Sequence, residues 1–567
     1  MVKYLIAFKL LFEERDIMSK INIMSLGGLN ENGKNLYLVS VNDKILIFDC
    51  GMKYAPEKMY GVDYVIPDFT YLIEHKNDIV GVFISHPHRE NMGALTDLVK
   101  AIPDINVYAS AYTSEIIKYE CAEDKIEIKN LHTIKAHKKI DFNNDFSVFP
   151  FSVTHSSPET LGYSVNTKDG AIIYMADFVI DPTMSGNYDM DLGKLAYIGK
   201  QGVLCLMSES VFAEKKGHTS PNHKLESFFK KVVDKAEGRI IFTVLPLHIY
   251  TIQEIFNSLK GKNRKVVIMG KELHSIVSIC IKNNYLDIEE DMIGNLTNLK
   301  DEKTVILISN DRETPYSNIN RIINGHDKFI SLLKTDTICF AEPSYDAYEK
   351  LLVKIMNELA IKGVNIVPIP KEKSVRHHAS SEDLMMLIKL FNPKYYMPIK
   401  CEYRYQVENG NLAYKVGIPK ENILLKENGD IVTFVDGKLV DNFDRVFVDD
   451  ILIDGNFSED VGELVLKDRE LLSSNGLVVI SSTLSKKDKT IVIEPEVMTR
   501  GFIYAKDNMD IIGEVKRIAL EVIKENTFSN KYADYVKIRN DLREKVGAYL
   551  YKETQCKPVI LTVIQEI

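Results

Sequence analysis

The sequence predicts an α/β protein of several domains. Apolar segments of strand length alternate with helical patterns along its 567 residues, and short turns rich in Gly, Asn and Asp separate them. Residues 44–48 and 202–206 are typical of buried strands, and the second segment precedes a polar loop and a helical pattern. A chain of this length can bury more than one hydrophobic core.

The amino-terminal segment, residues 1–17, carries a short apolar run followed by charged residues. The run is too short to span a membrane and lacks the small-residue cleavage site of a signal peptide. We interpret the segment either as an N-terminal extension or as the product of an upstream start codon, with Met18 as the functional start. The rest of the chain carries no other targeting signal and no predicted membrane span.

The distribution of strand-like segments and turn residues predicts further domains. A second α/β block is expected between about 220 and 374, where residues 239–244, 265–269 and 304–308 are strand-like. Charged residues punctuated by Gly and Asp predict a linker over 438–461, and residues 462–567 are expected to form a small α+β terminal domain.

Net charge and cysteine spacing each argue against certain classes of protein. A net charge of −9 argues against a protein that coats nucleic acid generally, although it allows a local basic channel. The seven cysteines are scattered and odd in number, and they form no CxxC motif. Such a pattern favours a cytoplasmic protein without disulfides or a thiolate zinc site.

Four residues at predicted strand ends form a candidate metal site. His86 and His88 directly follow the apolar segment 79–84, His155 ends an alternating run, and Asp177 follows another strand. Three imidazoles and a carboxylate are a plausible tetrahedral zinc shell. Asp49, at a further strand end, is placed to orient a ligating histidine.

Each of these residues also has a simpler interpretation. A single His-x-His arises readily by chance in a chain with 13 histidines, His155 alone is more often a loop or core residue, and Asp177 alone is typical of a turn. Only the ordered set, with each member at a strand end, favours a metal site over these alternatives.

Longer motifs carry a family resemblance, and they extend from the first strand to the end of the chain. In order they are Gly27-Gly28-Leu29-Asn30-Glu31-Asn32-Gly33, Phe48-Asp49-Cys50-Gly51, His86-Pro87-His88, His155-Ser156-Ser157-Pro158, Asp177-Phe178, Ser208-Glu209-Ser210, His378-Ala379-Ser380-Ser381-Glu382, Glu402-Tyr403-Arg404 and Arg500-Gly501-Phe502-Ile503-Tyr504. This set resembles the ribonuclease J family of metallo-β-lactamase enzymes with an inserted β-CASP domain.

The resemblance implies a fold and an activity. It implies a metallo-β-lactamase αββα sandwich in two parts, 18–219 and 375–437, with the β-CASP domain at 220–374 and a C-terminal assembly domain at 462–567. It also implies metal-dependent 5′-to-3′ exonucleolytic and endonucleolytic cleavage of RNA, in which two zinc ions hold the attacking hydroxide.

The second metal position departs from the family pattern. Its residues here are Glu90, Asn91, the shared Asp177 and Lys400. Protonated lysine cannot ligate zinc, and Asn is a poor ligand, so we expect one zinc ion and doubt a second. Lys400 either places its charge where the second cation would lie, pairing with Asp177 and Glu90, or is a remnant of drift.

The expected RNA contacts are also altered. His248, His378 and Ser380 remain as candidate phosphate contacts, with loop packing as the alternative, and Asp177, Glu90 and His378 are the candidate catalytic residues. The loop at 309–315, which is glycine-rich in the family, has no glycine here.

Two classes of function therefore compete. One is an active zinc-dependent ribonuclease, and the other is an RNA-binding subunit with weak or absent activity that pairs with a catalytic ribonuclease J paralogue. We favour the second, as a homo- or hetero-dimer or tetramer. Hydrolysis of a small ester or lactam is disfavoured, because a β-CASP insertion closes an RNA channel.

Overall fold

The computed structural model describes residues 19–55, 59–142, 145–310, 316–342, 348–373, 376–440, 443–455, 463–503, 508–527 and 533–567. The expected extension at 1–17 lies outside these ranges. The chain forms two compact units, residues 1–54 with 64–451 and residues 55–63 with 452–567. In the described ranges, no helix has both the length and the apolar character that a membrane crossing requires.

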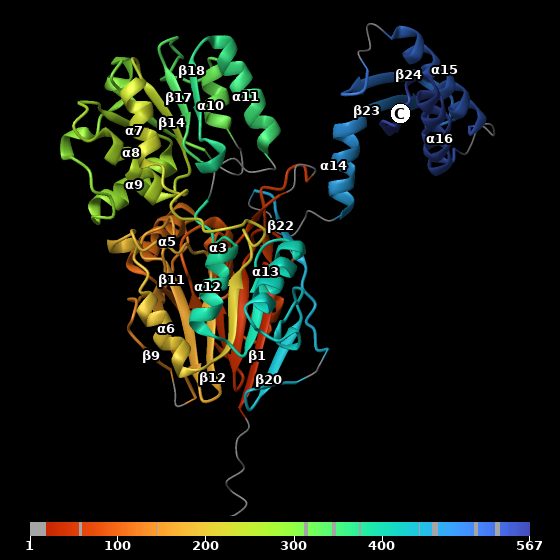
Figure 1. Cartoon of the computed structure of the whole chain (residues 1–567). Coiled ribbons are helices and arrows are strands. Elements are labelled where there is room, and N and C mark those ends of the chain that lie inside the picture. Colours follow the sequence, from red (N-terminus) through yellow and green to blue (C-terminus); the bar gives the residue numbers. More distant parts are fainter. Residues whose placement is uncertain are drawn as a thin grey trace, which may run out of the picture. The chain divides into compact units, whose positions relative to one another are not determined.

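The first unit contains a sandwich of two sheets (Figure 1). Within the described residues, one sheet has the order β21 (Lys438–Val440), β20 (Ile431–Val435), β1 (Lys20–Gly27), β2 (Leu36–Val41), β3 (Lys44–Phe48), β6 (Ile79–Phe83), β7 (Val107–Ala109), β8 (Leu131–Thr133). The other has the order β19 (Tyr395–Ile399), β13 (Val203–Glu209), β12 (Gly170–Met175), β11 (Leu161–Thr167), β10 (Phe146–Ser152), β9 (Ile140–Asp141).

Aromatic and aliphatic side chains fill the space between the two sheets. The ring of Phe48 lies 5.2 Å from that of Tyr174 and 5.6 Å from that of Tyr163, and all three side chains are buried. Such ring pairs add to the stabilisation that comes from burying their apolar area. The two tyrosines of this layer also reach strand ends near the candidate ligands, because the Tyr174 hydroxyl donates to Asp49 and the Tyr163 hydroxyl donates to the Ile84 carbonyl.

Helices cover the outer faces of the sandwich. Helices α6 (Leu192–Gln201), α12 (Ser381–Phe391) and α13 (Tyr403–Lys415) bury apolar side chains against the second sheet. Helix α5 (Ala111–Glu123) packs on β7 and β8 of the first sheet, and α4 (Leu95–Ala101) buries three of its apolar residues. The αββα architecture expected from the sequence is confirmed.

The chain returns to the sandwich after a long insertion. Strand β19 pairs in parallel with β13, and β20 pairs antiparallel with β1. Residues on both sides of the insertion therefore complete the same two sheets. This topology brings Lys400, at the end of β19, to the sheet edge where β12 and β13 also end.

The insertion, where the resemblance implies a β-CASP domain, is an α/β domain with a parallel sheet. Among the described residues its strand order is β15 (Val266–Met269), β16 (Val305–Ser309), β14 (Ile240–Val244), β17 (Thr337–Phe340), β18 (Asn365–Pro368). Its helices are α7 (Glu226–Lys235), α8 (Ile249–Leu259), α9 (Lys271–Lys282), α10 (Ser317–Ile323) and α11 (Glu349–Lys362). The first three strands begin and end within one residue of the segments expected from the sequence.

The second unit is a small α+β domain. Strand β23 (Leu477–Leu484) pairs antiparallel with β24 (Ile491–Arg500) and in parallel with β25 (Val559–Glu566). Helices α15 (Met509–Glu525) and α16 (Tyr535–Thr554) pack on this sheet through a buried apolar core, and α14 (Glu463–Asn475) precedes it. The expected linker, 438–461, includes β21 and β22 (Asp450–Ile453).

Short elements complete the loops of the sandwich. Strands β4 (Lys53–Tyr54) and β5 (Tyr64–Pro67) pair antiparallel, and α2 (Thr70–Glu74) follows them. Helix α3 (Arg89–Met92) begins immediately after His88, which is its N-terminal flanking residue. This short helix fixes the backbone of the His-x-His loop.

Candidate metal centre

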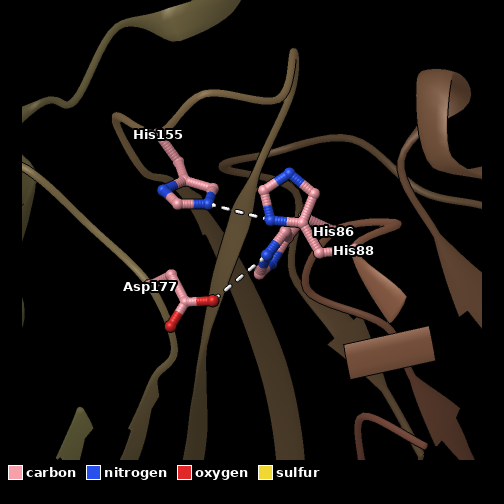
Figure 2. A group of neighbouring side chains, drawn as sticks. All are labelled: His86, His88, His155 and Asp177. Atoms are coloured by element: carbon pink, nitrogen blue, oxygen red, sulfur yellow. Dashed lines mark hydrogen bonds and ion pairs between the residues drawn. The ribbon is translucent and has the colours of Figure 1, made fainter. Parts of the chain in front are cut away.

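The structure gathers His86, His88, His155 and Asp177 into one buried cluster. Their ligand atoms all lie within 4.8 Å of one another. His86 and His88 follow β6, His155 follows β10 and Asp177 follows β12, and Figure 2 shows the four side chains pointing toward one another. None of the four residues is more than 8% exposed. Residues from both sheets therefore meet at one end of the sandwich.

A hydrogen-bond relay orients His86. The hydroxyl of Ser85 donates to Oδ2 of Asp49 at 2.9 Å, and the same hydroxyl lies 2.9 Å from Nδ1 of His86. Because this proton of Ser85 is directed at Asp49, its oxygen accepts from Nδ1–H of His86, which leaves Nε2 as the ring atom that can face a metal ion. Nε2 of His86 is buried and has no hydrogen-bond partner among the described residues, although it lies 3.2 Å from the Asp177 carboxylate.

Asp49 is the centre of this supporting network. Besides Ser85, its Oδ2 accepts from the Asn91 amide at 2.6 Å and from the Tyr174 hydroxyl at 2.5 Å, and its Oδ1 accepts from the Ser85 backbone at 2.7 Å. Asp49 therefore reaches His86 through the Ser85 hydroxyl and contacts no candidate ligand histidine directly among the described residues. The amide nitrogen of Asn91 is directed at Asp49 and is held in this supporting layer.

His155 and His88 complete the imidazole set. Nδ1 of His155 lies 2.8 Å from the carbonyl oxygen of His377, so it carries the proton and leaves the Nε2 lone pair facing Nδ1 of His88 at 3.3 Å. Burial, reinforced by neighbouring histidines, holds the pKa of His155 well below its usual range. Neutral imidazoles are the form that ligates metals.

The residues present fit a zinc ion. Three imidazoles and one carboxylate are a typical donor set, and Nε2 of His86 is a buried ligand atom that forms no hydrogen bond within the described ranges. His86, His88, His155 and Asp177 are the residues that would hold the ion.

Lys400 lies beside this cluster and contacts Asp177. Its ammonium nitrogen lies 2.7 Å from Oδ1 of Asp177, and the residue is 3% exposed. Burial alone would raise the pKa of Asp177, but the charge of Lys400, followed by that of His378, outweighs it and holds the pKa well below the usual value. Asp177 is therefore an ionised carboxylate that links the histidine cluster to a buried cation.

The backbone at Lys400 is held in an unusual conformation. Lys400 and Cys401 have φ values of 63° and 66°, in the left-handed region. Non-glycine residues adopt sparsely populated conformations at a cost of about 1–3 kcal/mol, so they persist where tertiary contacts impose them. Here the Lys400 amide donates to the Tyr37 hydroxyl at 3.1 Å, and Gln406 donates to the Cys401 carbonyl at 3.1 Å.

A second group of potential ligands adjoins the first. Ligand atoms of Asp177, Glu209 and His378 also lie within 4.8 Å of one another. Nδ1 of His378 lies 2.7 Å from Oε2 of Glu209, whose Oε1 accepts from the backbone of Phe178 at 2.9 Å and of Ala379 at 3.2 Å. Burial raises the pKa of Glu209.

A cavity opens beside these groups. The described residues that line it are Asn32, Gly33, Asn35, His88, Glu90, His155, Ser156, Asp177, Val211, His248, Arg376, His377, His378 and Lys400. Its lining therefore includes the candidate catalytic residues Asp177, Glu90 and His378 and two of the candidate metal ligands, His88 and His155.

Two of the three expected phosphate contacts, His248 and His378, line this cavity. His248 lines the cavity and stacks on His88, with ring centroids 4.7 Å apart, and burial lowers its pKa to about 3. His378 also lines the cavity, but Ser380 is not among its described lining residues. The Ser380 hydroxyl lies 2.7 Å from that of Thr219. Within the loop at 309–315, residues 311–315 lie outside the described ranges.

Sequence reasoning gave no site role to Glu209, and it considered His377 only as part of a basic cluster that could contact RNA. Glu209 is the last residue of a fully buried strand, which is an expensive position for an unpaired carboxylate. That placement could have marked it as a functional candidate. His377 orients His155 through its backbone carbonyl oxygen. Any residue has such a carbonyl, so the sequence gives no signal for this contact.

Comparisons with known proteins give consistent matches. The family models described as "Ribonuclease J, beta-CASP domain" and "Ribonuclease J C-terminal domain" match residues 237–359 and 464–567. Ribonuclease J 2 of Staphylococcus aureus is 31% identical over 551 residues, which cover 96% of this chain and 98% of that protein. Ribonuclease J 2 of Staphylococcus epidermidis is 31% identical over 550 residues, with the same shares covered.

One solved structure is similar in fold. A protein of unknown function from Enterococcus faecalis matches with a TM-score of 0.50 and 16% sequence identity, covering 73% of this chain and 100% of that one. At this level of identity the likeness concerns the fold alone.

Proposed function

The chain belongs to the ribonuclease J family, and we propose that it is an RNA-binding subunit of bacterial RNA processing and decay with weak or absent nuclease activity of its own. The observation that carries this proposal is the buried Lys400 ammonium, 2.7 Å from Oδ1 of Asp177. A cation supplied by the protein there competes with a second metal ion for the same carboxylate.

The residues around the candidate centre support a single zinc ion. When bound, such an ion supplies Lewis-acid polarisation of a phosphoryl oxygen and lowers the pKa of a coordinated water. Oδ2 of Asp177 lies 3.2 Å from Nε2 of His86, and Oδ1 accepts a hydrogen bond from Lys400. Asn91 is directed at Asp49, and Glu90 lines the cavity as a carboxylate that opposes the approach of phosphate.

Single-metal chemistry is a poor basis for fast RNA hydrolysis. Lys400 can neutralise part of the charge that develops on a phosphate, but its protonated nitrogen has no lone pair with which to activate water. Loss of one electrostatic stabiliser of this type commonly lowers the rate by about 10²–10³. RNA binding is less affected, because phosphate recognition depends on cations at many positions along the strand.

A second candidate function is an active zinc-dependent 5′-to-3′ exo- and endoribonuclease. It is favoured by the group of Asp177, Glu209 and His378, whose ligand atoms lie within 4.8 Å of one another and could hold a second ion in a different arrangement. Against it, both oxygens of Glu209 already accept hydrogen bonds, and Lys400 holds the shared Asp177.

The partner that we propose is a catalytic ribonuclease J paralogue in the cytoplasm, in a hetero-dimer or tetramer, with a homodimer as the alternative. The C-terminal unit supports this proposal. One face of its sheet presents partly exposed apolar side chains in neighbouring register positions, Met498, Val479 and Leu561. Met498 and Leu561 are 59% and 44% exposed, as expected for a surface that a partner covers.

Nuclease and binding assays with one RNA test this proposal. We expect purified full-length protein to bind a 5′-monophosphorylated single-stranded RNA while degrading it slowly or not at all, and His88→Ala to leave binding intact. Robust zinc- or manganese-dependent turnover that His88→Ala abolishes would establish the second candidate function. Failure to bind RNA would refute both.

A further inference from the structure

We propose that Lys215 and Arg376, positioned by the ring of Phe212, form a binding subsite for one backbone phosphate of single-stranded RNA at the entrance of the metal centre. The inference rests on the proposed function and adds the position and chemistry of one RNA contact. It concerns residues outside the metal-ligand set, and it assigns Phe212 a positioning role.

Two cations converge on one aromatic ring. Nζ of Lys215 lies 4.7 Å from the centroid of the Phe212 ring, and Cζ of Arg376 lies 5.5 Å from it. Both distances are within the range in which a cation is attracted by the face of a ring. Lys215 follows β13 and Arg376 precedes α12, so the ring holds together two charges from distant parts of the sequence.

The backbone fixes the two segments to each other. Phe212 forms an isolated parallel β-bridge with Ser380, and the Ser381 amide donates to the Lys215 carbonyl at 2.9 Å. The Ser380 amide in turn donates to Asp383 at the start of α12. The subsite is therefore built on paired backbone, which keeps its geometry without a bound ligand.

The ammonium group of Lys215 is poorly compensated. Lys215 is half-buried, and in the described part of the chain no carboxylate forms an ion pair with its ammonium group. Burial, followed by the nearby charge of Arg376, lowers the pKa of Lys215. An anion bound between the two cations would relieve this repulsion and restore the solvation that burial removes.

The subsite leads directly to the candidate metal centre. Arg376 lines the same cavity as His88, Asp177 and Lys400. The ring of Phe212 also lies edge-on to that of His378, with centroids 5.5 Å apart, and His378 lies 3.6 Å from Asp177. A strand whose phosphate binds Lys215 and Arg376 therefore continues past His378 into the cavity.

Phosphodiester RNA is the ligand that this arrangement favours. Phosphate oxygens accept charge-assisted hydrogen bonds from ammonium and guanidinium groups, and the guanidinium can donate two in parallel. Such contacts position a strand without reading its sequence. We propose a single strand, because the residues that line the cavity come from the sandwich and, through His248, from the insertion.

Salt-dependent RNA binding tests the subsite. The full-length, metal-loaded protein is titrated with a fluorescently labelled oligouridylate at several salt concentrations. We expect Lys215→Ala and Arg376→Ala each to weaken binding about 3- to 10-fold and to reduce the slope of log K against log salt by about 0.7, the value for one lost single-strand phosphate contact. Lys215→Arg should retain both affinity and slope.

Lys420→Ala is the matched control. Nζ of Lys420 lies 5.0 Å from the Tyr414 ring, which gives a similar lysine–aromatic pair without a second cation on that ring among the described residues. We expect this variant to bind RNA as the parent does. Equal losses for Lys215→Ala and Lys420→Ala, or an unchanged salt slope for Lys215→Ala, would overturn the subsite.

Two further outcomes separate the subsite from the proposed function. If the parent protein fails to bind the oligouridylate, the proposed function fails with the subsite. If the parent binds RNA and Lys215→Ala weakens polyglutamate binding by the same factor, the two cations form a general anion site and the assignment to RNA is overturned. Thermal unfolding and zinc content should be unchanged in Lys215→Arg and Lys420→Ala.

Discussion

The ammonium nitrogen of Lys400 lies 2.7 Å from Oδ1 of Asp177, and 223 residues separate them in the chain. Asp177 is thereby shared between a buried cation of the protein and a cluster of three histidines. A pair of this kind is stable only when both charges are present, because removal of one leaves the other buried without compensation. We therefore expect the identity of residue 400 to set how many metal ions Asp177 can bind.

We predict at most one tightly bound zinc ion per chain. The donor set at the first position is complete, whereas Lys400 holds the carboxylate that a second ion would share. Elemental analysis of purified, undialysed protein measures this number. A value near two would contradict the prediction, and a value near zero would identify the histidines as structural remnants.

Restoring ligands at the second position should raise activity. The combined change of Glu90→Asp, Asn91→His and Lys400→His supplies metal ligands and removes the competing ammonium. We expect a second zinc equivalent and an increase in the rate of RNA hydrolysis of about 10²-fold or more. Single-turnover degradation of 5′-monophosphorylated RNA provides the measurement.

The control for this gain is the same triple variant with His88→Ala, which should lose the added activity. A gain that survives His88→Ala would come from another nuclease in the preparation. An increase in zinc content without any gain in rate would show that the altered cavity, rather than the missing ion, limits catalysis.

Stability should fall as pH rises because of Glu254. Burial raises the pKa of this glutamate to about 8, and its Oε1 accepts from the Leu225 amide at 2.8 Å. Between the unfolded value near 4.5 and about 8, only the folded state keeps the proton. The contribution of Glu254 to the free energy of unfolding is fully present below pH 4.5. It decreases between pH 4.5 and about 8, by up to about 1.4 kcal/mol per pH unit.

Glu254→Gln should flatten this dependence, since the amide stays neutral and keeps an oxygen acceptor for Leu225. Unfolding by urea at pH 5.5, 7 and 8.5 measures the difference, with the exposed Glu237→Gln in the same domain as the control. Parallel pH profiles for the parent protein and Glu254→Gln would show that Glu254 does not bind a proton on folding.

The β-CASP domain should depend on a buried ion pair. The guanidinium of Arg239 donates to both oxygens of Asp336 at 2.8 and 2.7 Å and to the carbonyls of Leu299 and Ser331 at 2.8 Å. Removing one member of such a pair costs about 3–5 kcal/mol. We therefore expect Arg239→Ala to lower the free energy of unfolding by this amount in chemical denaturation.

An exposed pair in the same unit provides the comparison. Arg445, whose side chain is 55% exposed, lies 3.2 Å from Glu427. Arg445→Ala should change stability by less than about 1 kcal/mol. If both arginine variants lower the free energy of unfolding by similar amounts, burial does not determine how much the Arg239–Asp336 pair contributes to stability.

Association should require the C-terminal unit. We expect deletion of residues 462–567 to abolish co-purification with a catalytic ribonuclease J paralogue, while the first unit, which has its own cores, remains folded. Size-exclusion chromatography with light scattering measures the assembly. A truncated protein that still binds the paralogue, or a full-length protein that stays monomeric beside it at micromolar concentration, would refute the proposed partnership.

Much of the fold could be predicted from sequence because its signals are local. Apolar runs such as Lys44–Phe48 read as buried strands, and the spacing of His86 and His88 after β6 places both imidazoles at one strand end. Family motifs extended this local pattern to the β-CASP and C-terminal domains. Strand ends could be placed within a residue because burial and turn residues change sharply there.

Tertiary structure alone decided what surrounds each candidate ligand. The parallel pairing of β19 with β13 carries Lys400 to Asp177, and that of the Phe212 segment with Ser380 carries Lys215 toward Arg376. Neither contact leaves a periodic pattern in the sequence, since each depends on the register of strands far apart in the chain. The sequence by itself determined which chemical groups this protein carries, and the pairing of its strands decided which charges those groups meet.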